Sequence, residues 1–186
     1  LHTTAESHHR IILLEVMGRD AGWIALHAGL TGGAHLILIP EIPLSLDKIC
    51  AVIEQRYSEN KRYSIIVVAE GVRLAPELAE VVPPGVKRPK RFVSDRLAEL
   101  IAERTQHDVR VTVLGHTQRG GSPTPADRLL SARFGVAAVE MAARGEFGQM
   151  AALRGGAIVQ VPLTEACAKM KTVDPQGELV HVARSI

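Results

Sequence analysis

The chain has 186 residues, a formal net charge of +2, and 46% hydrophobic against 23% charged residues. This composition excludes the disordered and fibrous classes. Aromatic residues make up only 3% and no basic stripe is present, so nucleic-acid binding is not expected. The apolar runs fall short of the roughly 18 to 20 residues that a membrane span needs, and no leader pattern opens the chain. These features predict a soluble, cytoplasmic protein without a membrane partner.

The residues that most often bind metals in proteins are poorly placed here. Cys50 and Cys167 are far apart in the sequence, so we expect two reduced thiols and neither a disulfide nor a zinc site. His8 and His9 are adjacent and should point to opposite faces of an extended segment. The sequence therefore predicts no metal site.

Apolar, β-branched runs recur along the chain and alternate with segments of helical spacing. The runs predict buried parallel strands at residues 11–16, 36–39, 65–69, 109–114 and 157–161. The helical segments cover residues 21–30, 46–57 and 95–104, with Ser45 and Ser94 as N-caps of the last two, and a longer helix runs from Pro125 to about residue 144. The proline-rich stretch 74–91 should be an exposed connection. This alternation predicts an α/β fold with a doubly wound, mostly parallel sheet and helices on both faces.

Charged residues and glycines follow four of the predicted strands. In an open parallel sheet, ligands bind beyond the carboxyl ends of the strands. The residues at these ends are Glu15, Met17, Gly18 and Arg19; Pro40 and Glu41; Glu70 and Gly71; and Gly115, His116, Gln118 and Arg119. Each alone fits a structural role such as a helix cap or a surface ion pair. Together they favour a phosphorylated polyol as ligand, because arginines bind phosphate and carboxylates accept hydrogen bonds from hydroxyls.

Two further arginines stand at the opposite ends of the predicted strands. Arg10 precedes the first strand and Arg110 begins the fourth. One strand length, roughly 17 to 20 Å, separates them from the polar edge. They are therefore either surface residues or ligands of a site in a neighbouring chain.

Four stretches of the sequence resemble successive signatures of the 6-phosphofructokinase family. They are SHHRIILLEVMGRDAGWIALHAG, AHLILIPE, IIVVAEG and RVTVLGHTQRGGSPTPADR, and they occur in the family's order over nearly the whole chain. The resemblance implies a phosphofructokinase-like fold. It also implies transfer of a phosphoryl group to the 1-hydroxyl of fructose 6-phosphate, which gives fructose 1,6-bisphosphate in glycolysis.

The resemblance assigns roles to residues at matching motif positions. Met17, Gly18 and Arg19 would hold the sugar and Glu70 would accept its hydroxyls. His116 and Arg119 would hold the 6-phosphate. Arg10 and Arg110 would reach the sugar phosphate of a neighbouring subunit, which implies a homodimer or homotetramer.

The family's catalytic segment has no counterpart in this chain. Its glycine-rich nucleotide turns and its TIDND aspartates, which supply the general base and help to place Mg²⁺, are expected before residue 1. We therefore expect a fragment with no catalytic or metal-binding residue of its own, which is inactive alone. By the same resemblance, residues 1–117 form a sugar-phosphate-binding α/β subdomain, 118–163 return to a nucleotide-binding subdomain, and 164–186 are a truncated C-terminal segment.

Several alternatives stay open at this point. The phosphoryl donor could be ATP, which is the commoner one, or pyrophosphate. If the protein is not an enzyme, the alternative is a noncatalytic module that binds a sugar phosphate. Where allosteric relatives carry an effector-site glutamate this chain has His35, and Glu59 replaces a basic residue, although Lys61 and Arg62 are present. The altered set predicts weak or absent regulation by ADP or phosphoenolpyruvate.

Overall fold

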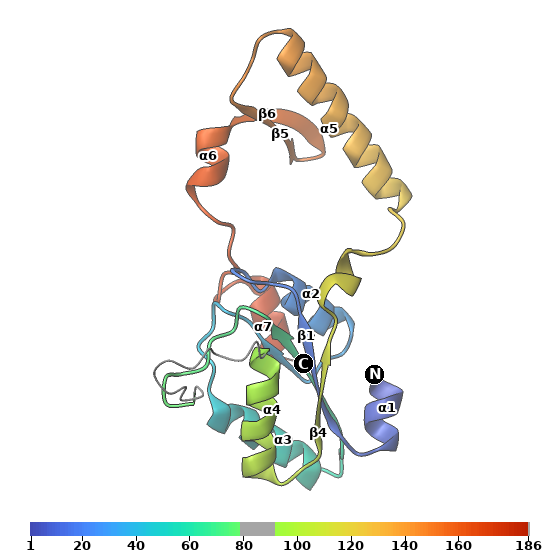
Figure 1. The fold of residues 1–186 in the computed structure, drawn as a ribbon, viewed down its shortest axis with the longest axis vertical. Helices are drawn as coiled ribbons and strands as arrows, with labels where there is room; N and C mark the ends of the chain where they lie inside the picture. The colour runs from blue at the N-terminus through green and yellow to red at the C-terminus, as the bar shows by residue number, and fades with distance from the viewer. Residues whose placement is uncertain (79–91, 186) are drawn as a thin grey trace, which may run out of the picture. The chain divides into compact units, whose positions relative to one another are not determined.

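The structure is a computed structural model that describes residues 1–78 and 92–185 (Figure 1). Most of the predicted exposed connection 74–91 lies outside the described residues. The helices and strands in chain order are α1 (His2–Ser7), β1 (Ile11–Val16), α2 (Trp23–Thr31), β2 (Leu36–Leu38), α3 (Leu46–Ser58), β3 (Ser64–Ala69), α4 (Val93–Thr105), β4 (Val109–Val113), η1 (Gly115–Arg119), α5 (Pro125–Ala143), β5 (Gln149–Arg154), β6 (Ala157–Pro162), α6 (Leu163–Ala168) and α7 (Glu178–Ser185).

Four strands form one parallel sheet in the order β2-β3-β1-β4. Strand β1 is central: Ile11 pairs with Ser64 of β3 on one side and with Val109 of β4 on the other. All residues of β3 are buried, as expected for a strand covered on both faces. The predicted α/β fold with a mostly parallel sheet is confirmed, and the first four predicted strands lie within a residue of their observed bounds.

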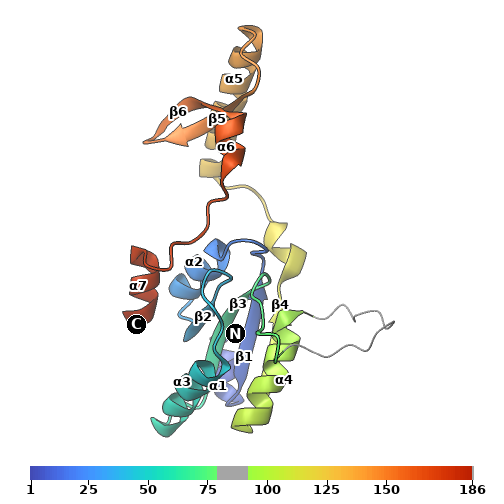
Figure 2. The ribbon, with the colours of Figure 1, turned by 90° about the vertical axis from the view of Figure 1, so that its left-hand side faces the viewer.

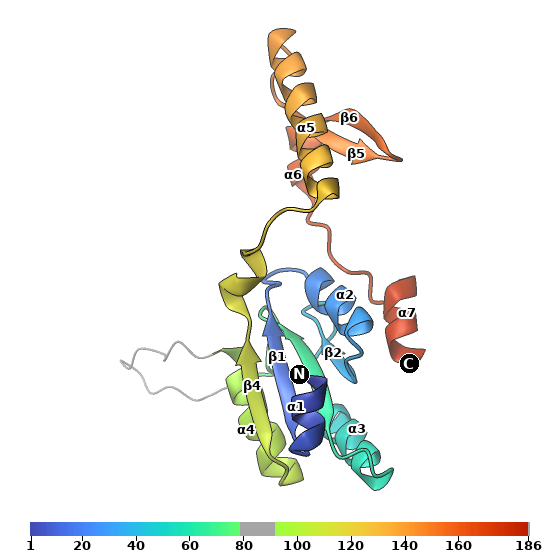
Figure 3. The same ribbon diagram turned by 90° about the vertical axis from the view of Figure 1, so that its right-hand side faces the viewer.

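Helices cover both faces of this sheet, and the alternation of side chains along β1 decides what each face contacts. Ile12 packs with Ala5 of α1, and the backbone of α2 approaches Ile37 of β2 closely at Gly29. On the opposite face, Arg56 of α3 bonds to Ser64 of β3. Figures 2 and 3, which view the ribbon from opposite sides, show α1 on one side of the sheet and α3 and α4 on the other.

Glu15 of β1 is a buried carboxylate on the face covered by α4. Its side chain accepts hydrogen bonds from the backbone N–H of Ser94, at 3.0 Å, and from the Ser94 hydroxyl. Both residues are at most 3% exposed. The carboxylate therefore satisfies a free N–H in the first turn of α4, where the helix dipole also favours negative charge.

This contact corrects two sequence predictions. Glu15 stands near the carboxyl end of β1, as predicted, but its side chain is not available to a ligand, because its position in the alternation turns it toward α4. Ser94 is not the N-cap, because α4 begins at Val93 after Phe92 and the Ser94 hydroxyl donates to Glu15. By contrast, Ser45 caps α3 as predicted, with its hydroxyl accepting a hydrogen bond from the N–H of Lys48.

The fifth predicted strand is also corrected. Strand β6 is not part of the parallel sheet but pairs with β5 as an antiparallel hairpin. Its residues are exposed or partly buried, with Val161 the buried exception. Strand β5 carries no clear strand signal in the sequence, because its mixed pattern includes Gln149 and Arg154.

The described residues divide into two compact units. The first unit comprises residues 1–118 and 172–185, and the second comprises 119–171. Thus the C-terminal segment, predicted as one piece from residue 164, is shared between them. The second unit consists of the long helix α5, the β5–β6 hairpin and α6. The functional division predicted at 117/118 and 163/164 stays a prediction.

The second unit has little core of its own. Among its hydrophobic residues only Met141 and Val161 are buried, whereas Leu129, Val139 and Phe147 are 65%, 70% and 78% exposed. Helix α5 begins with a capping box, in which Thr124 and Asp127 exchange hydrogen bonds, so local interactions support its start. No helix in residues 1–78 or 92–185 is long and apolar enough to cross a membrane.

The Glu15–Ser94 contact makes a stability prediction. Ser94→Ala removes one donor from a buried carboxylate, and we expect a loss of about 1.5 to 3 kcal/mol in the free energy of unfolding. Urea unfolding followed by circular dichroism measures it. Ser58→Ala is the matched control, because the exposed Ser58 hydroxyl bonds only to Gln55 O within its own helix, and its cost should stay below about 0.5 kcal/mol. Equal losses in the two variants would contradict this account.

Candidate functional site

Hydrogen bonds to two other segments, one after β3 and one after β4, hold the loop that follows β1. Met17 N–H donates to Gln118 Oε1 at 2.8 Å, and Gly18 N–H donates to Glu70 Oε1 at 3.3 Å. Gly71 N–H donates to Gly18 O at 3.1 Å. The loops after β1, β3 and β4 therefore meet at the carboxyl edge of the sheet, as the sequence predicts.

Two glycines allow this close approach. Gly18 has φ of +144°, a conformation that residues with a side chain rarely adopt. A Cβ atom at Gly71 would lie 2.0 Å from Arg19 O and 2.7 Å from Gly18 O. Only glycine fits at position 71, because both obstructing atoms belong to the backbone.

The side chains around this loop are available to a ligand. Arg19 and Glu70 are exposed, Met17 is partly buried, and His116 is exposed within the short helix η1 that follows β4. Arg119 ends η1, is exposed, and begins the second unit. The first unit thus provides a cation at Arg19, a carboxylate at Glu70 and an imidazole at His116. Groups of this kind can bind a polar anion such as a sugar phosphate.

Not every carboxylate at this edge is free for a ligand. Both oxygens of Glu41, which follows β2, accept from Gly22 N–H at 3.0 and 3.1 Å, and Oε1 also accepts from Val173 N–H at 2.8 Å. Glu41 therefore fastens the start of α2 and the returning C-terminal segment. With Glu15 buried against α4, Glu70 is the exposed carboxylate of the predicted set.

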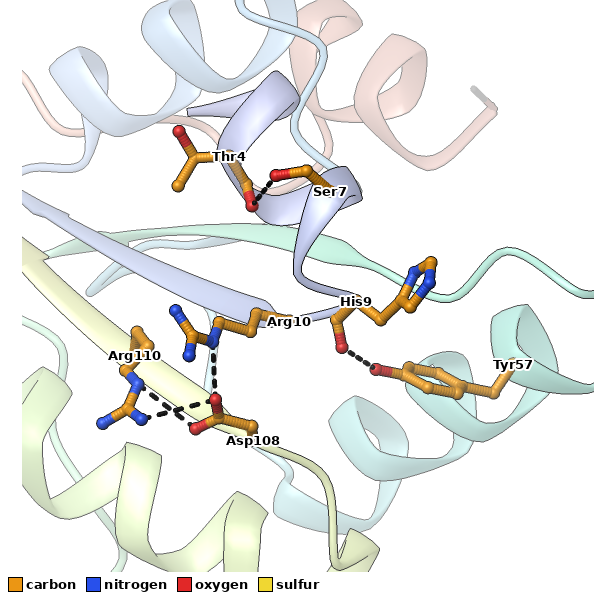
Figure 4. A network of polar contacts seen from close by, with 7 residues as sticks. All are labelled: Thr4, Ser7, His9, Arg10, Tyr57, Asp108 and Arg110. Atoms are coloured by element: carbon orange, nitrogen blue, oxygen red, sulfur yellow. Dashed lines mark hydrogen bonds and ion pairs between the residues drawn. The ribbon is translucent and has the colours of Figure 1, made fainter.

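Arg10 and Arg110 lie at the other edge of the sheet and contact the same residue (Figure 4). Arg10 Nε donates to Asp108 Oδ2 at 2.6 Å, and Arg110 Nε lies 3.2 Å from Asp108 Oδ1. Their placement at the amino ends of β1 and β4 agrees with the strand positions predicted from the sequence. Any role at a site in a neighbouring chain stays a prediction.

A second polar region contains Lys61 and Arg62, which the family resemblance places at the position of an effector site. A cavity of about 660 Å³ is lined by Glu6, Arg56, Lys61, Arg62 and others. Lys61 is paired with Glu59 at 2.7 Å, so part of its charge is neutralised by its own neighbour. The predicted weak regulation is not tested by these contacts and stays a prediction.

His35 is half-buried beside this cavity. Its Nδ1 accepts a hydrogen bond from Ile65 N–H at 2.9 Å, and its ring meets those of His2 and Tyr63 edge to face. Burial, with added repulsion from Arg56, His2 and Lys61, lowers the pKa of His35 from 6.5 to about 4. A neutral ring is required for Nδ1 to act as acceptor.

The parallel sheet with helices on both faces and polar loops at its carboxyl edge defines a doubly wound α/β protein, a class in which small ligands bind at that edge. A family model described as Phosphofructokinase matches residues 1–142. The chain therefore belongs to the phosphofructokinase family.

Curated relatives agree with this assignment. A protein of Chloroflexus aurantiacus named ATP-dependent 6-phosphofructokinase is 52% identical over 187 residues, which cover 100% of this chain and 51% of the relative. One of Spirochaeta thermophila with the same name is 47% identical over 190 residues, with 100% and 52% covered. The chain thus spans about half the length of the curated relatives it matches.

Solved structures give the same fold. The pyrophosphate-dependent phosphofructokinase from Marinobacter aquaeolei is 27% identical with a TM-score of 0.74, covering 93% of this chain and 45% of that one. Phosphofructokinase from Saccharomyces cerevisiae is 34% identical with a TM-score of 0.73, covering 90% and 21%.

Sequence reasoning missed three residues that shape these sites. Gln118 was noted at the strand end but not assigned a role, although it fixes Met17. Gly71 follows β3, but the neighbouring residues do not reveal the close approach to the backbone of Gly18 and Arg19 that requires a glycine there. Asp108 was not considered, although its position immediately before β4 and two residues from Arg110 was a usable signal.

Gly71 allows a direct test of the loop geometry. In Gly71→Ala the loop backbone must move, and we expect a loss of about 1 to 3 kcal/mol in unfolding free energy, with amide NMR shifts concentrated at residues 17–19. Gly135→Ala is the control, because a Cβ there meets nothing within 4 Å and alanine favours a helix. A Gly71→Ala protein as stable as the parent would refute the close packing.

His35 makes the stability depend on pH in a defined direction. Its folded pKa of about 4 lies below the ordinary 6.5, so the unfolded chain binds the proton first. Stability should be complete above about pH 6.5 and fall as the pH drops toward 4. Urea unfolding at pH 7, 5.5 and 4.5 measures this, and His35→Gln should reduce the slope.

The control is His181→Gln, which changes an exposed histidine on α7. It leaves the contact between Ile65 N–H and His35 Nδ1 in place, so the contribution of His35 to the slope should remain. A slope that is the same in the parent and in His35→Gln would show that another group is responsible.

Proposed function

We propose that the chain is the fructose 6-phosphate-binding part of an ATP-dependent 6-phosphofructokinase. The complete enzyme transfers the γ-phosphoryl group of ATP to the 1-hydroxyl of fructose 6-phosphate. The convergence of the loops after β1, β3 and β4 at one edge of the sheet carries the proposal. Family membership and the names of the curated relatives support it.

The roles of the residues follow from their chemistry and their motif positions. The fastened loop of Met17, Gly18 and Arg19 holds the sugar, and the exposed Glu70 carboxylate accepts hydrogen bonds from sugar hydroxyls. His116 and Arg119 bind the 6-phosphate through charge-assisted hydrogen bonds. Because the loop is held before the ligand arrives, little ordering is required on binding.

Arg10 and Arg110 act on the sugar phosphate bound by a second subunit. Their position at the opposite edge of the sheet supports this assignment, since one subunit cannot bring both edges to one phosphate. The complete enzyme is accordingly a homodimer or homotetramer. We place it in the cytoplasm, where the sequence composition predicts the chain to be.

The described residues do not supply the rest of the catalytic machinery. No group of three or more histidine, cysteine, aspartate or glutamate side chains in residues 1–78 and 92–185 could hold a metal ion. Mg²⁺ at phosphoryl-transfer sites is usually held by one or two carboxylates together with substrate phosphates, and we expect the metal and the general base to come from outside this chain. Phosphoryl transfer depends mainly on positioning and charge neutralisation, so the chain by itself binds the sugar without reacting.

Pyrophosphate is the alternative phosphoryl donor. The Marinobacter aquaeolei structure, described as pyrophosphate-dependent, supports it through a TM-score of 0.74. ATP is favoured because the relatives at about 50% identity carry the ATP-dependent name. A noncatalytic sugar-phosphate-binding module is the remaining candidate, and it predicts binding without turnover in the full-length protein.

The decisive experiment assays the full-length protein encoded by the reading frame that contains this chain. Purified protein receives fructose 6-phosphate, Mg²⁺ and either ATP or pyrophosphate, and fructose 1,6-bisphosphate is measured. We expect turnover with ATP. Turnover with pyrophosphate alone would change the donor, and binding without turnover with either donor would favour the noncatalytic module.

A substitution pair tests the assigned phosphate ligand. Arg119→Ala removes a charge-assisted contact worth about 1.5 to 3 kcal/mol, and we expect KM for fructose 6-phosphate to rise roughly 10- to 100-fold. Arg154→Ala is the control, because this exposed arginine pairs with Glu165 and carries no assigned role. An unchanged KM in Arg119→Ala would remove Arg119 from the site.

A further inference from the structure

Asp108 connects the two arginines at the amino edge of the sheet. Arg10 Nε donates to Oδ2 at 2.6 Å, Arg110 Nη2 donates to the same oxygen at 3.4 Å, and Arg110 Nε lies 3.2 Å from Oδ1. The close-up in Figure 4 shows both guanidinium groups directed at this one carboxylate. A single carboxylate therefore contacts two cations, one just before β1 and one in β4.

Backbone pairing brings Arg10 and Asp108 side by side. Ile11 pairs with Val109 in the parallel register, and Ile11 N–H donates to Asp108 O at 3.0 Å, so the residues just before each strand lie side by side. The turn before β1 is also fixed, because Tyr57 OH donates to His9 O at 3.1 Å and Arg10 N–H donates to Ala5 O at 2.9 Å.

The cluster of Arg10, Arg110 and Asp108 carries a net positive charge that can attract an anion. Two arginines and one aspartate sum to +1 if the three groups are ionised, and their side chains are 32%, 61% and 43% exposed for Arg10, Arg110 and Asp108. The terminal nitrogens of Arg10 bond to no residue within 1–78 and 92–185. Exposed ion pairs of this kind add little to folding stability, so stability is a poor explanation for the arrangement.

We propose that Asp108 is a positioning residue that holds Arg10 and Arg110 together as one preorganised binding pair for the phosphate of a sugar bound by a neighbouring subunit. The inference rests on the proposed function, which gives the two arginines that ligand. Arginine side chains have many rotamers, and a carboxylate that restrains two of them reduces the ordering required when phosphate binds.

The opposite role for Asp108 makes the opposite prediction. A carboxylate that only screened the arginines, or competed with phosphate for them, would weaken binding, and its removal would raise the local charge from +1 to +2 and tighten binding. A positioning carboxylate improves binding despite its unfavourable charge, and its removal weakens binding. The sign of the change therefore distinguishes the two roles.

The test measures steady-state kinetics of the full-length protein with Asp108→Ala and with the isosteric Asp108→Asn. We expect both variants to raise KM for fructose 6-phosphate by about 5- to 20-fold, with kcat changed less than about 2-fold. Asp108→Glu, which retains the carboxylate, should restore part of the loss. When both arginines are already alanine, Asp108→Ala should have no further effect.

The matched control is Asp47→Ala. Asp47 forms an ion pair with Arg104 between α3 and α4 on the same unit, but it faces no proposed ligand. It should leave KM unchanged, and thermal unfolding of every variant identifies any loss of fold.

The outcomes separate this proposal from the function on which it rests. If Arg10→Ala and Arg110→Ala leave KM unchanged, the role of the arginines at a second subunit's phosphate is wrong. If those variants raise KM but Asp108→Ala and Asp108→Asn lower it or leave it unchanged, only the positioning role of Asp108 is overturned.

Discussion

The parallel pairing of β1 with both β3 and β4 is the constraint on which the rest of the structure depends. This register brings the ends of three strands to one edge, where Gln118 and Glu70 can fasten the backbone of the loop after β1. The same register sets Asp108 beside Arg10 at the other edge. Because side chains project from a rigid sheet at fixed intervals, two polar clusters one strand length apart arise from a single pattern of backbone hydrogen bonds.

The alternation of side chains along β1 explains how one strand serves both a core and a site. Ile11 and Leu13 are fully buried, and Glu15, next in the same alternation, is also buried because α4 covers that face. A buried carboxylate is costly unless it is hydrogen-bonded, and Ser94 at the start of α4 provides two donors. The strand leaves the core only after Val16, and from there its residues become available to a ligand.

The two units differ in how completely they bury their own apolar side chains. The first unit encloses its sheet between helices and contains nearly all of the buried hydrophobic residues, whereas α5 of the second unit leaves Leu129 and Val139 exposed. A helix with so few buried apolar side chains contributes little to a core of its own. Together with the coverage of about half of the curated relatives, this supports the proposal that a larger protein supplies the catalytic groups.

The sequence by itself determined the four strands of the parallel sheet, the four longest helices, the fold class and the family, because apolar runs, glycine punctuation and long motifs are local signals. It also placed Met17, Gly18, Arg19 and His116 correctly at strand ends. Only the tertiary structure decided that Glu15 and Glu41 hold the fold together, that β6 pairs with β5 outside the main sheet, and that Asp108 joins Arg10 to Arg110. These outcomes depend on which distant segments meet. The residues next to a carboxylate do not determine whether it is buried, and the residues next to a strand do not determine which strand it pairs with.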